Sequence, residues 1–278
     1  MLNDFENYLE EEEKSPNTIK SYCGHVRQYL KWYQESFGMK FNVLYRENIL
    51  EFKSYLHNIK KQNGKTINAK LSALLKFNEF LVDTGNQEDI VVTKKDMMRI
   101  QVRGTSPTDV TKQEVERFRQ QMLEHEGSRN YCIVTIMVYA GLRVSEVLNL
   151  KLDDVNTRTK EIVVKHGKGS KQRIVYMNNK ISNALDEYLE KRPKAESDYL
   201  FISNRGNRLD RTVINKMFNR YSNKITPHKL RHFFCTNALE NGFAVHEVAY
   251  LAGHSNIHTT LRYTNPSEEE MKAKMNRL

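Results

Sequence analysis

Apolar residues recur three and four positions apart through most of the chain, which is the spacing of one helix face. Ser15 before Pro16 is a typical helix start, because serine caps free backbone N–H groups and proline suits the first helical position. Turn-forming residues at 84–86 end the last helix of this part. Residues 1–87 are therefore predicted to form a small helical domain. Its helices are expected at residues 1–12, from 16 onward, at 46–60 and at 66–83.

The helical pattern stops after residue 87. Residues 88–108 combine basic residues, among them Lys94 and Lys95, with a turn-forming run from Gly104 to Pro107. We interpret this segment as a basic linker, which makes residues 109–278 a second domain. A length of 278 residues is typical of two domains.

The second domain mixes helical and strand patterns. Thr111 and Glu114 have the spacing of a capping box, and the nearly all-apolar residues 131–140 predict a buried helix. Two short β-branched runs, 162–164 and 174–176, predict a hairpin. The fold class is therefore predicted as mainly α with a small antiparallel β-sheet. Further elements are expected as a strand at 199–202 and helices at 181–191, 211–221, from 227, at 244–252 and at 267–278.

Charge changes this picture. The net charge is +10 and the pI is about 9.3, with +2 in residues 1–103 and +8 in residues 104–278. A basic balance suggests a polyanionic partner, most simply double-stranded DNA. Candidate phosphate contacts lie on the second and fourth predicted helices, although a solvated lysine face would have the same sequence. These residues are Lys20, Arg27, Lys31, Lys65 and Lys70.

Hydropathy and cysteine usage exclude several classes of protein. Mean hydropathy is −0.69 and no run of 18 apolar residues exists, so no transmembrane helix is expected. The acidic first residues argue against a signal peptide. Cys23, Cys132 and Cys235 are far apart, which argues against a disulfide framework or a structural zinc site. We expect a cytoplasmic protein with no membrane partner.

The tip of the predicted hairpin is rich in glycine and basic residues. Gly167 and Gly169 flank Lys168, which permits a tight turn and a close approach to a ligand. Lys171 and Arg173 follow, and we include both among the candidate DNA contacts. An ordinary surface hairpin would look similar, so both interpretations stay open at this point.

Reactive side chains concentrate between residues 226 and 263. This stretch contains His228, Arg231, His254 and Tyr263, which are types that a helical core does not need. Together they suit the binding of a phosphate and an attack on it, because guanidinium and imidazole groups donate to phosphate oxygens and a phenol is a nucleophile. A free phenol has a pKa of about 10, so it needs a base or a cationic field to react near neutral pH.

A metal site is the main alternative for the histidines. His228 and His232 are four residues apart, as are His254 and His258, and this spacing occurs in zinc sites. The helical zinc-hydrolase motif has glutamate after its first histidine, whereas this chain has Lys229. We therefore expect neither a metal nor a cofactor.

At these residues the chain resembles the tyrosine recombinase family, which includes the phage integrases and the Xer recombinases. The resemblance spans residues 109–265, and the helical domain before them is similar to the family's SAM-like core-binding domain. It implies a two-domain, C-shaped clamp made of that domain and a catalytic domain. The resemblance rests on AGLRVSEVL at 140–148, GKGSKQR at 167–173, HKLRH at 228–232, LAGH at 251–254, and Tyr263 nine residues after His254.

The resemblance implies a role for each matched residue. Tyr263 would attack a DNA phosphodiester and form a 3′-phosphotyrosine, while Arg143 and Arg231 bind the non-bridging oxygens. The other implied roles are a phosphate donor at His254, a proton carrier at His228, an acid for the leaving 5′-oxygen at Lys168, and a supporting carboxylate at Glu146.

The resemblance also implies an assembly. A site-specific recombinase of this family acts as a homo-tetramer on two DNA sites, through a Holliday junction, and we expect a monomer when it is free in solution. The segment after Tyr263 is long enough to dock on a neighbouring protomer.

Two alternative functions stay open. An enzyme resembling a type IB topoisomerase shares the phosphotyrosine chemistry but acts alone. A catalytically silent DNA-binding protein would have lost at least one reactive residue, and none is lost here. The motifs are compatible with integration, excision or resolution. We expect no additional N-terminal domain for binding arm sites, such as some phage integrases have, and this favours a simple recombinase or a mobile-element resolvase.

Overall fold

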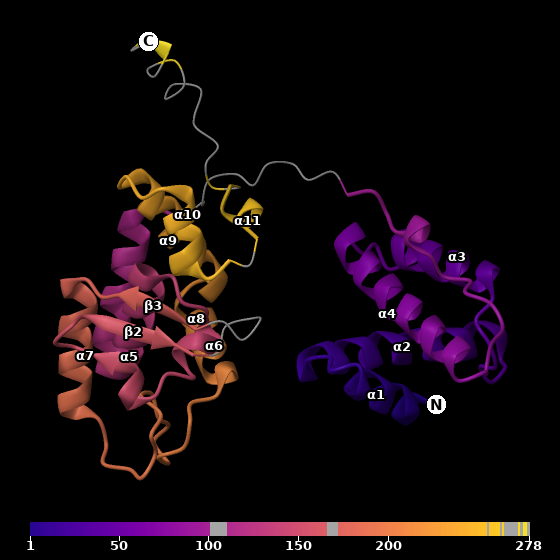
Figure 1. The fold of residues 1–278 in the computed structure, drawn as a ribbon, viewed down its shortest axis with the longest axis horizontal. Coiled ribbons are helices and arrows are strands. Elements are labelled where there is room, and N and C mark those ends of the chain that lie inside the picture. Colours follow the sequence, from indigo (N-terminus) through magenta and orange to yellow (C-terminus); the bar gives the residue numbers. More distant parts are fainter. Residues whose placement is uncertain are drawn as a thin grey trace. The chain divides into compact units, whose positions relative to one another are not determined.

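The computed structural model describes residues 1–100, 110–165, 172–254, 256–261, 263, 272, 275 and 276. The chain divides into two compact units, residues 1–102 and 103–278 (Figure 1). The elements of the first unit are α1 (Leu2–Glu11), α2 (Pro16–Phe37), α3 (Arg46–Ser54), a π-helical turn (Tyr55–Ile59), α4 (Gly64–Asp83) and a 3-10 turn (Lys94–Asp96).

The first unit is a bundle of helices around an aromatic core. Tyr29 of α2 meets Phe52 of α3 edge to face, with ring centroids 5.2 Å apart. Phe5 of α1 meets Phe77 of α4 in the same way at 5.1 Å. All four rings are buried, so these aromatic residues form the core. The helices predicted for this part of the chain are confirmed.

Residues 89–98 pack onto the first unit, although the sequence predicted a linker from residue 88 onward. Asn78 of α4 is fully buried, and its side-chain oxygen accepts from the backbone N–H groups of Val91 and Val92 at 2.7 and 2.9 Å. These bonds satisfy backbone groups that would otherwise be buried without a partner. The rest of the predicted linker, residues 101–109, lies outside the described residues.

Lys70 of α4 does not lie on the surface, and its predicted exposed position is wrong. The residue is only 6% exposed and borders a small hollow with Trp32 and Tyr55. It shares a helix face with the buried Leu74 and Phe77, four and seven positions further on. Burial lowers the pKa of its ammonium group.

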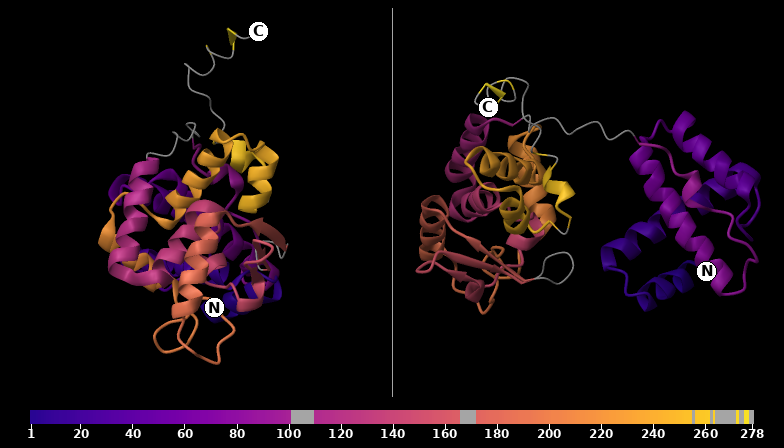
Figure 2. Two further views of the ribbon diagram at one scale, coloured as in Figure 1. Left: turned by 90° about the vertical axis from the view of Figure 1, so that its left-hand side faces the viewer. Right: turned by 45° about the horizontal axis from the view of Figure 1, so that its top comes forward.

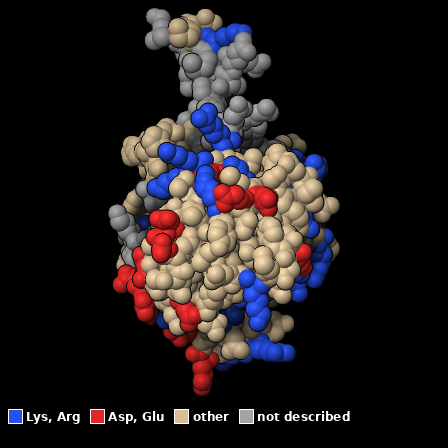
Figure 3. Space-filling model, turned by 90° about the vertical axis from the view of Figure 1, so that its right-hand side faces the viewer, with Lys and Arg blue, Asp and Glu red and all other residues tan. Residues whose placement is uncertain are grey.

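The other candidate contacts of this unit are exposed. On the molecular face in Figure 3, Lys and Arg side chains lie in separate groups around a largely uncharged area. That face therefore does not define a DNA surface by its charge. The exposed candidates are Lys20, Arg27, Lys31 and Lys65.

Helix α5 forms the centre of the second unit and packs against α7 and α9 (Figure 1). Helix α10 packs against β3, so the sheet and the last helices lie side by side (Figure 2). The elements are α5 (Lys112–Ala140), α6 (Val144–Val147), a 3-10 turn (Leu152–Asp154), β1 (Val155–Asn156), β2 (Glu161–Val164), β3 (Arg173–Tyr176), α7 (Asn179–Lys191), α8 (Arg211–Tyr221), α9 (Pro227–Glu240), α10 (Val245–Ala252) and α11 (His258–Leu261).

A break at Gly127 divides α5 where the sequence predicted two helices. The φ of Gly127 is 79° and its ψ is 177°, which are not helical values. The predicted capping box at the start of α5 is confirmed. The N–H of Glu114 donates to the Thr111 hydroxyl at 3.3 Å, and the N–H of Thr111 donates to the Glu114 carboxylate at 2.8 Å.

The sheet has the order β1-β2-β3 and is antiparallel throughout, with Val163 opposite Ile174. The predicted hairpin is confirmed, while its tip, residues 166–171, lies outside the described residues. The predicted strand at 199–202 is wrong, because in the described part of the chain its two ends form only isolated bridges, with Lys151 and with Arg208. The predicted class, mainly helical with a small antiparallel sheet, is confirmed. Within the described ranges, no helix is both long and apolar enough to span a membrane.

The buried amide of Asn78 provides a test of the first unit. We expect Asn78→Ala to lower the free energy of unfolding by about 2–4 kcal/mol, because it leaves buried N–H groups without an acceptor. Trp32 is the only tryptophan of the chain, so its fluorescence during urea unfolding reports on this unit. The exposed Asn42 gives the matched control, and equal effects of Asn78→Ala and Asn42→Ala would contradict the assignment.

Candidate active site

A buried carboxylate holds two arginines at the start of α6. Glu146 is 4% exposed, and its Oε1 accepts from Nη1 of Arg143 at 2.9 Å. Its two oxygens also accept from Nη1 and Nη2 of Arg173, at 3.1 and 3.0 Å. Burial alone would raise the pKa of Glu146, but the bonds and charges of the two arginines outweigh burial and lower the pKa. Glu146 therefore stays ionised at neutral pH.

Arg173 is held inside the second unit, and its predicted role as a DNA contact is wrong. The residue is 6% exposed, and both terminal nitrogens of its guanidinium bind Glu146. Its Nε donates to the backbone oxygen of Leu251 at 2.9 Å. These bonds leave Arg173 as a support that links β3, α6 and α10.

The backbone oxygens of two glycines accept hydrogen bonds from Arg231 and Arg143. Gly141 follows α5 with a φ of 64°, and Gly253 follows α10 with a φ of 65°. Nη1 of Arg231 donates to the oxygen of Gly141 at 2.8 Å, and Nη2 of Arg143 donates to that of Gly253 at 3.1 Å. Both oxygens lie at helix C-termini, where the helix dipole favours a cation. Segments about a hundred residues apart are thereby joined at one place.

Arg231 of α9 is a buried cation with one unpaired donor. It is 5% exposed, and among the described residues its Nη2 has no hydrogen-bond partner. Loss of solvent and the charge of Arg143 lower its pKa to about 10, so it stays charged at neutral pH. An unsatisfied buried donor costs about 1–3 kcal/mol, and more when it is charged. This atom is therefore suited to an anion that comes from outside the chain.

Two histidines contact the ring of the candidate nucleophile, and a third is paired with one of them. Nε2 of His228 and Nε2 of His232, on successive turns of α9, lie 2.8 Å apart. The ring of His232 meets the ring of Tyr263 edge to face, with centroids 5.0 Å apart. The ring of His254 lies nearly parallel to that of Tyr263 at 6.5 Å. The structure thus brings the predicted His228, His254 and Tyr263 to one place, together with His232.

The histidines of this cluster are neutral at pH 7. The pKa of each ring is lowered chiefly by loss of solvent. The second cause is the charge of Arg231 for His228 and His254, and the neighbouring His228 for His232. The pKa of His228 is lowered, and those of His232 and His254 fall to about 4. Nδ1 of His254 lies 2.7 Å from the hydroxyl of the buried Thr260, which fixes the imidazole ring.

Sequence reasoning missed three residues of this site. It treated His232 only as a metal-ligand alternative, gave no role to Thr260, and placed Arg173 on the surface. The four-residue spacing from His228 could have indicated the histidine pair. Lys168 and Lys171 lie outside the described residues, so their roles stay predictions. In the part of the chain that the structure describes, no group of three or more His, Cys, Asp or Glu residues is placed to hold a metal.

Comparison with known proteins decides the family. Residues 108–270 match the model of the Phage integrase family, and residues 2–85 match that of the Phage integrase, N-terminal SAM-like domain. The chain belongs to the phage integrase family. It is a tyrosine recombinase, as the motifs in its second domain predicted.

Relatives and solved structures match this recombinase over nearly its whole length. The TnP I resolvase of Bacillus thuringiensis is 51% identical to this chain. The match covers 98% of this chain and 97% of the resolvase. The tyrosine recombinase XerA of Thermococcus kodakarensis is 34% identical and covered to 93%, again over 98% of this chain. A crystal structure of XerA recombinase matches with a TM-score of 0.55 and 30% identity, covering 99% of this chain and 97% of that one. The Tn1549 transposon integrase, solved with a circular intermediate DNA, matches in fold with a TM-score of 0.76 and 20% identity, covering 100% and 99%.

The charge of Glu146 provides a pH-dependent test. Its pKa is lower in the folded state than in the unfolded chain, so it stabilises the fold above the unfolded value of about 4.3, and this stabilisation is lost as pH falls through the folded value. We expect Glu146→Gln to destabilise the second unit by about 2–4 kcal/mol at pH 7. The difference from the wild type should shrink below about pH 4. Hydrogen exchange of the α5 and α9 amides measures it, and the exposed Glu124→Gln is the control.

The close packing of Gly253 provides a second test with a matched control. A Cβ at Gly253 would lie 2.7 Å from the guanidinium carbon of Arg173, whereas a Cβ at Gly242, also with positive φ, would meet nothing within 4 Å. Both alanine substitutions carry the backbone strain, so their difference isolates the clash. We expect Gly253→Ala to lower the melting temperature several degrees more than Gly242→Ala. Equal shifts would show that Arg173 has room to move.

Proposed function

We propose that this tyrosine recombinase breaks and rejoins DNA at specific sites, with Tyr263 as the nucleophile. The observation that carries the proposal is the unpaired Nη2 of Arg231, a buried cationic donor in the same cluster as Arg143 and Tyr263. A phosphodiester offers two non-bridging oxygens to such donors. Arg231 and Arg143 would bind them, because guanidinium groups stay charged and donate in a fixed fork.

The reaction that follows moves one phosphoryl group between two oxygens. The phenol of Tyr263 gives up its proton, its oxygen bonds to phosphorus, and the bond from phosphorus to the 5′-oxygen breaks. Negative charge on the phosphoryl oxygens grows in the transition state, and each positioned donor there contributes about 3–4 kcal/mol. The 3′-phosphotyrosine keeps a phosphodiester, so a free 5′-hydroxyl rejoins the strand without a cofactor. Lys168 is proposed as the acid that protonates the leaving 5′-oxygen.

His254 fits the role of a neutral donor to the phosphate. A neutral imidazole carries one proton, and when the Thr260 hydroxyl donates to Nδ1, that proton is on Nε2. Nε2–H then donates to a phosphoryl oxygen without adding a third full charge to the two arginines.

The biological reaction that we propose is resolution, the recombination of two sites on one DNA molecule. The relative with 51% identity over 98% of this chain is named a resolvase. A resolvase of a mobile element needs the target DNA of its own element, and we propose that it acts in the cytoplasm on such DNA. DNA flanking its gene is therefore the first probe for footprinting.

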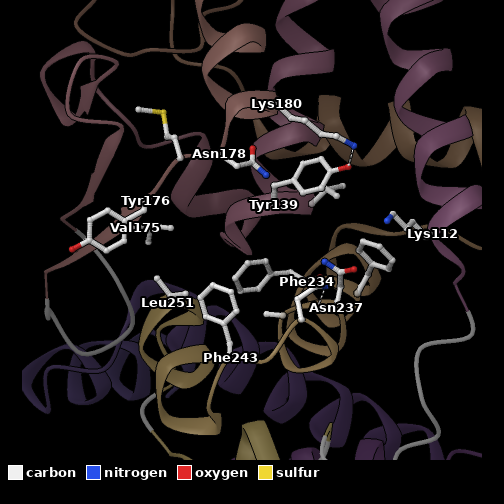
Figure 4. A pocket seen from close by; sticks show the side chains of 15 residues that line it. Lys112, Tyr139, Val175, Tyr176, Asn178, Lys180, Phe234, Asn237, Phe243 and Leu251 are labelled. Atoms are coloured by element: carbon white, nitrogen blue, oxygen red, sulfur yellow. Dashed lines mark hydrogen bonds between the residues drawn. The ribbon is translucent and has the colours of Figure 1, made fainter.

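We also propose that the enzyme works as a tetramer on two sites and that its last residues join the protomers. A groove of about 560 Å³ lies in the second unit (Figure 4). Phe234, Phe243 and Leu251 line it, with Lys112 and Lys180 towards one end.

The groove and the end of the chain are complementary in sequence chemistry. Residues 267–278 read SEEEMKAKMNRL, with three glutamates before Met271, Met275 and Leu278. Apolar residues four and three positions apart suit a helix lying in an apolar groove. The glutamates match the charge of the exposed Lys112 at its end, whereas Lys180 is already paired with Glu116. We propose that the tail of a second copy is the occupant.

The nucleophile is tested by covalent trapping. We expect Tyr263→Phe to bind a nicked substrate carrying the footprinted site but to form no covalent protein–DNA adduct, because phenylalanine lacks the attacking oxygen. Tyr250→Phe, at an exposed position of α10, should form the adduct at the normal rate. An adduct of normal yield from Tyr263→Phe would falsify the assignment.

The tail is tested by deletion and by a change in the groove. We expect deletion of residues 267–278 and the substitution Phe243→Asp each to reduce tetramers on DNA at least fivefold in sedimentation. The two changes together should do no more than either alone, because both remove one contact. Val213→Asp alters an exposed apolar residue outside the groove and should leave assembly unchanged. Additive effects would place the tail elsewhere.

A further inference from the structure

His232 contacts both partners of the proposed proton transfer. Its Nε2 lies 2.8 Å from Nε2 of His228, and its ring meets the ring of Tyr263 at 5.0 Å with an angle of 76° between their planes. His228 and His232 are four residues apart on α9, so their side chains share one helix face. A second imidazole therefore contacts both the expected proton carrier and the nucleophile.

A hydrogen bond between two Nε2 atoms restricts the protonation of both rings. One Nε2 must carry a proton and the other must be bare. Since both rings are neutral at pH 7, the ring that donates from Nε2 has a bare Nδ1. If His228 is the donor, its Nδ1 is left free to take a proton from the phenol.

We infer that His232 is a positioning residue for the attack by Tyr263, which accepts the Nε2–H of His228 and so keeps Nδ1 of His228 ready for the phenol proton. This inference rests on the proposed role of Tyr263. In the step, the phenol proton moves to Nδ1 of His228, the phenolate oxygen bonds to phosphorus, and the bond to the 5′-oxygen breaks. His228 becomes an imidazolium, and its bond to His232 becomes charge-assisted and stronger.

The surroundings explain why such a partner is needed. The charged and titratable groups around the pair of His228 and His232 are Arg231, Arg143 and His254. The positive charges of the two arginines oppose a proton on His228. A neutral acceptor beside His228 offsets part of this opposition without adding a charge. Burial and the neighbouring groups keep His232 itself neutral, with a pKa of about 4. The arrangement resembles the orientation of a base by a hydrogen-bonded third group.

The test compares substitutions that keep or remove the acceptor. His232→Phe keeps a ring against Tyr263 but cannot accept a hydrogen bond, whereas His232→Gln keeps an acceptor. We expect His232→Phe to slow covalent adduct formation about tenfold to a hundredfold on the nicked substrate, with His232→Gln in between. The acidic limb of the pH–rate profile should move to lower pH in His232→Phe, because the protonated form of His228 loses its partner.

Two controls separate this role from a structural one. His246→Phe changes an exposed histidine of α10 and should leave rate and profile unchanged. A His228→Ala, His232→Phe double variant should be no slower than His228→Ala alone, because His232 acts through His228. A folded His232→Phe with wild-type rate and an unmoved acidic limb would overturn the inference.

Nitrogen-15 NMR of the histidines in the intact, unsubstituted protein tests the inference without a variant. We expect Nε2 of His228 to be protonated and Nδ1 of His228 and Nε2 of His232 to be bare. The opposite pattern, with Nδ1 of His228 protonated, would overturn the inference even if neither His232 variant folds. Adduct formation by Tyr263→Phe would instead overturn the proposed function, and the NMR pattern would be unaffected.

Discussion

The ionised carboxylate of Glu146 is the group on which the second unit depends. It lies between the guanidinium groups of Arg143 and Arg173, close enough to neutralise part of both. Arg231 adds a third positive charge to the same cluster. Three cations in a partly dry space repel one another by several kcal/mol unless an anion lies among them. Glu146 thus allows Arg143 and Arg231 to lie in one cluster, while Arg173 serves as a support.

Backbone oxygens also accept hydrogen bonds from the two arginines that Glu146 binds. Arg173 and Arg143 bind the oxygens of Leu251 and Gly253, at the end of α10, so they fix that end against β3 and α6. His254 follows directly, and its ring position is therefore set by the same bonds. A displacement of α10 would move His254 and Arg143 together. These bonds couple the positions of Arg143 and His254 to the end of α10, so the two side chains are not placed independently.

Much of the fold and of the site could be predicted from local sequence. Caps such as Thr111 with Glu114, and the apolar spacing of the helices, depend on neighbours a few residues away. The residues of the site were recognised because five short stretches occur in a known order. Interactions between distant residues could not be predicted in this way. Arg173 appears basic and exposed in a hairpin until Glu146, 27 residues earlier, is seen beside it. The docking of residues 89–98 likewise depends on the buried amide of Asn78, and Lys70 is buried because its neighbours on α4 face the core.

The unpaired donor of Arg231 lowers the stability of the free protein. A buried cation with an unsatisfied N–H makes the free protein less stable than an apolar residue of similar size would, since the latter needs no partner. Stability of the free protein alone therefore does not account for an arginine at this position. A bound oxyanion removes the deficit, so the native state is tightest when the site is filled. The free energy that such an unpaired donor withholds from folding becomes available to any anion that pairs with it.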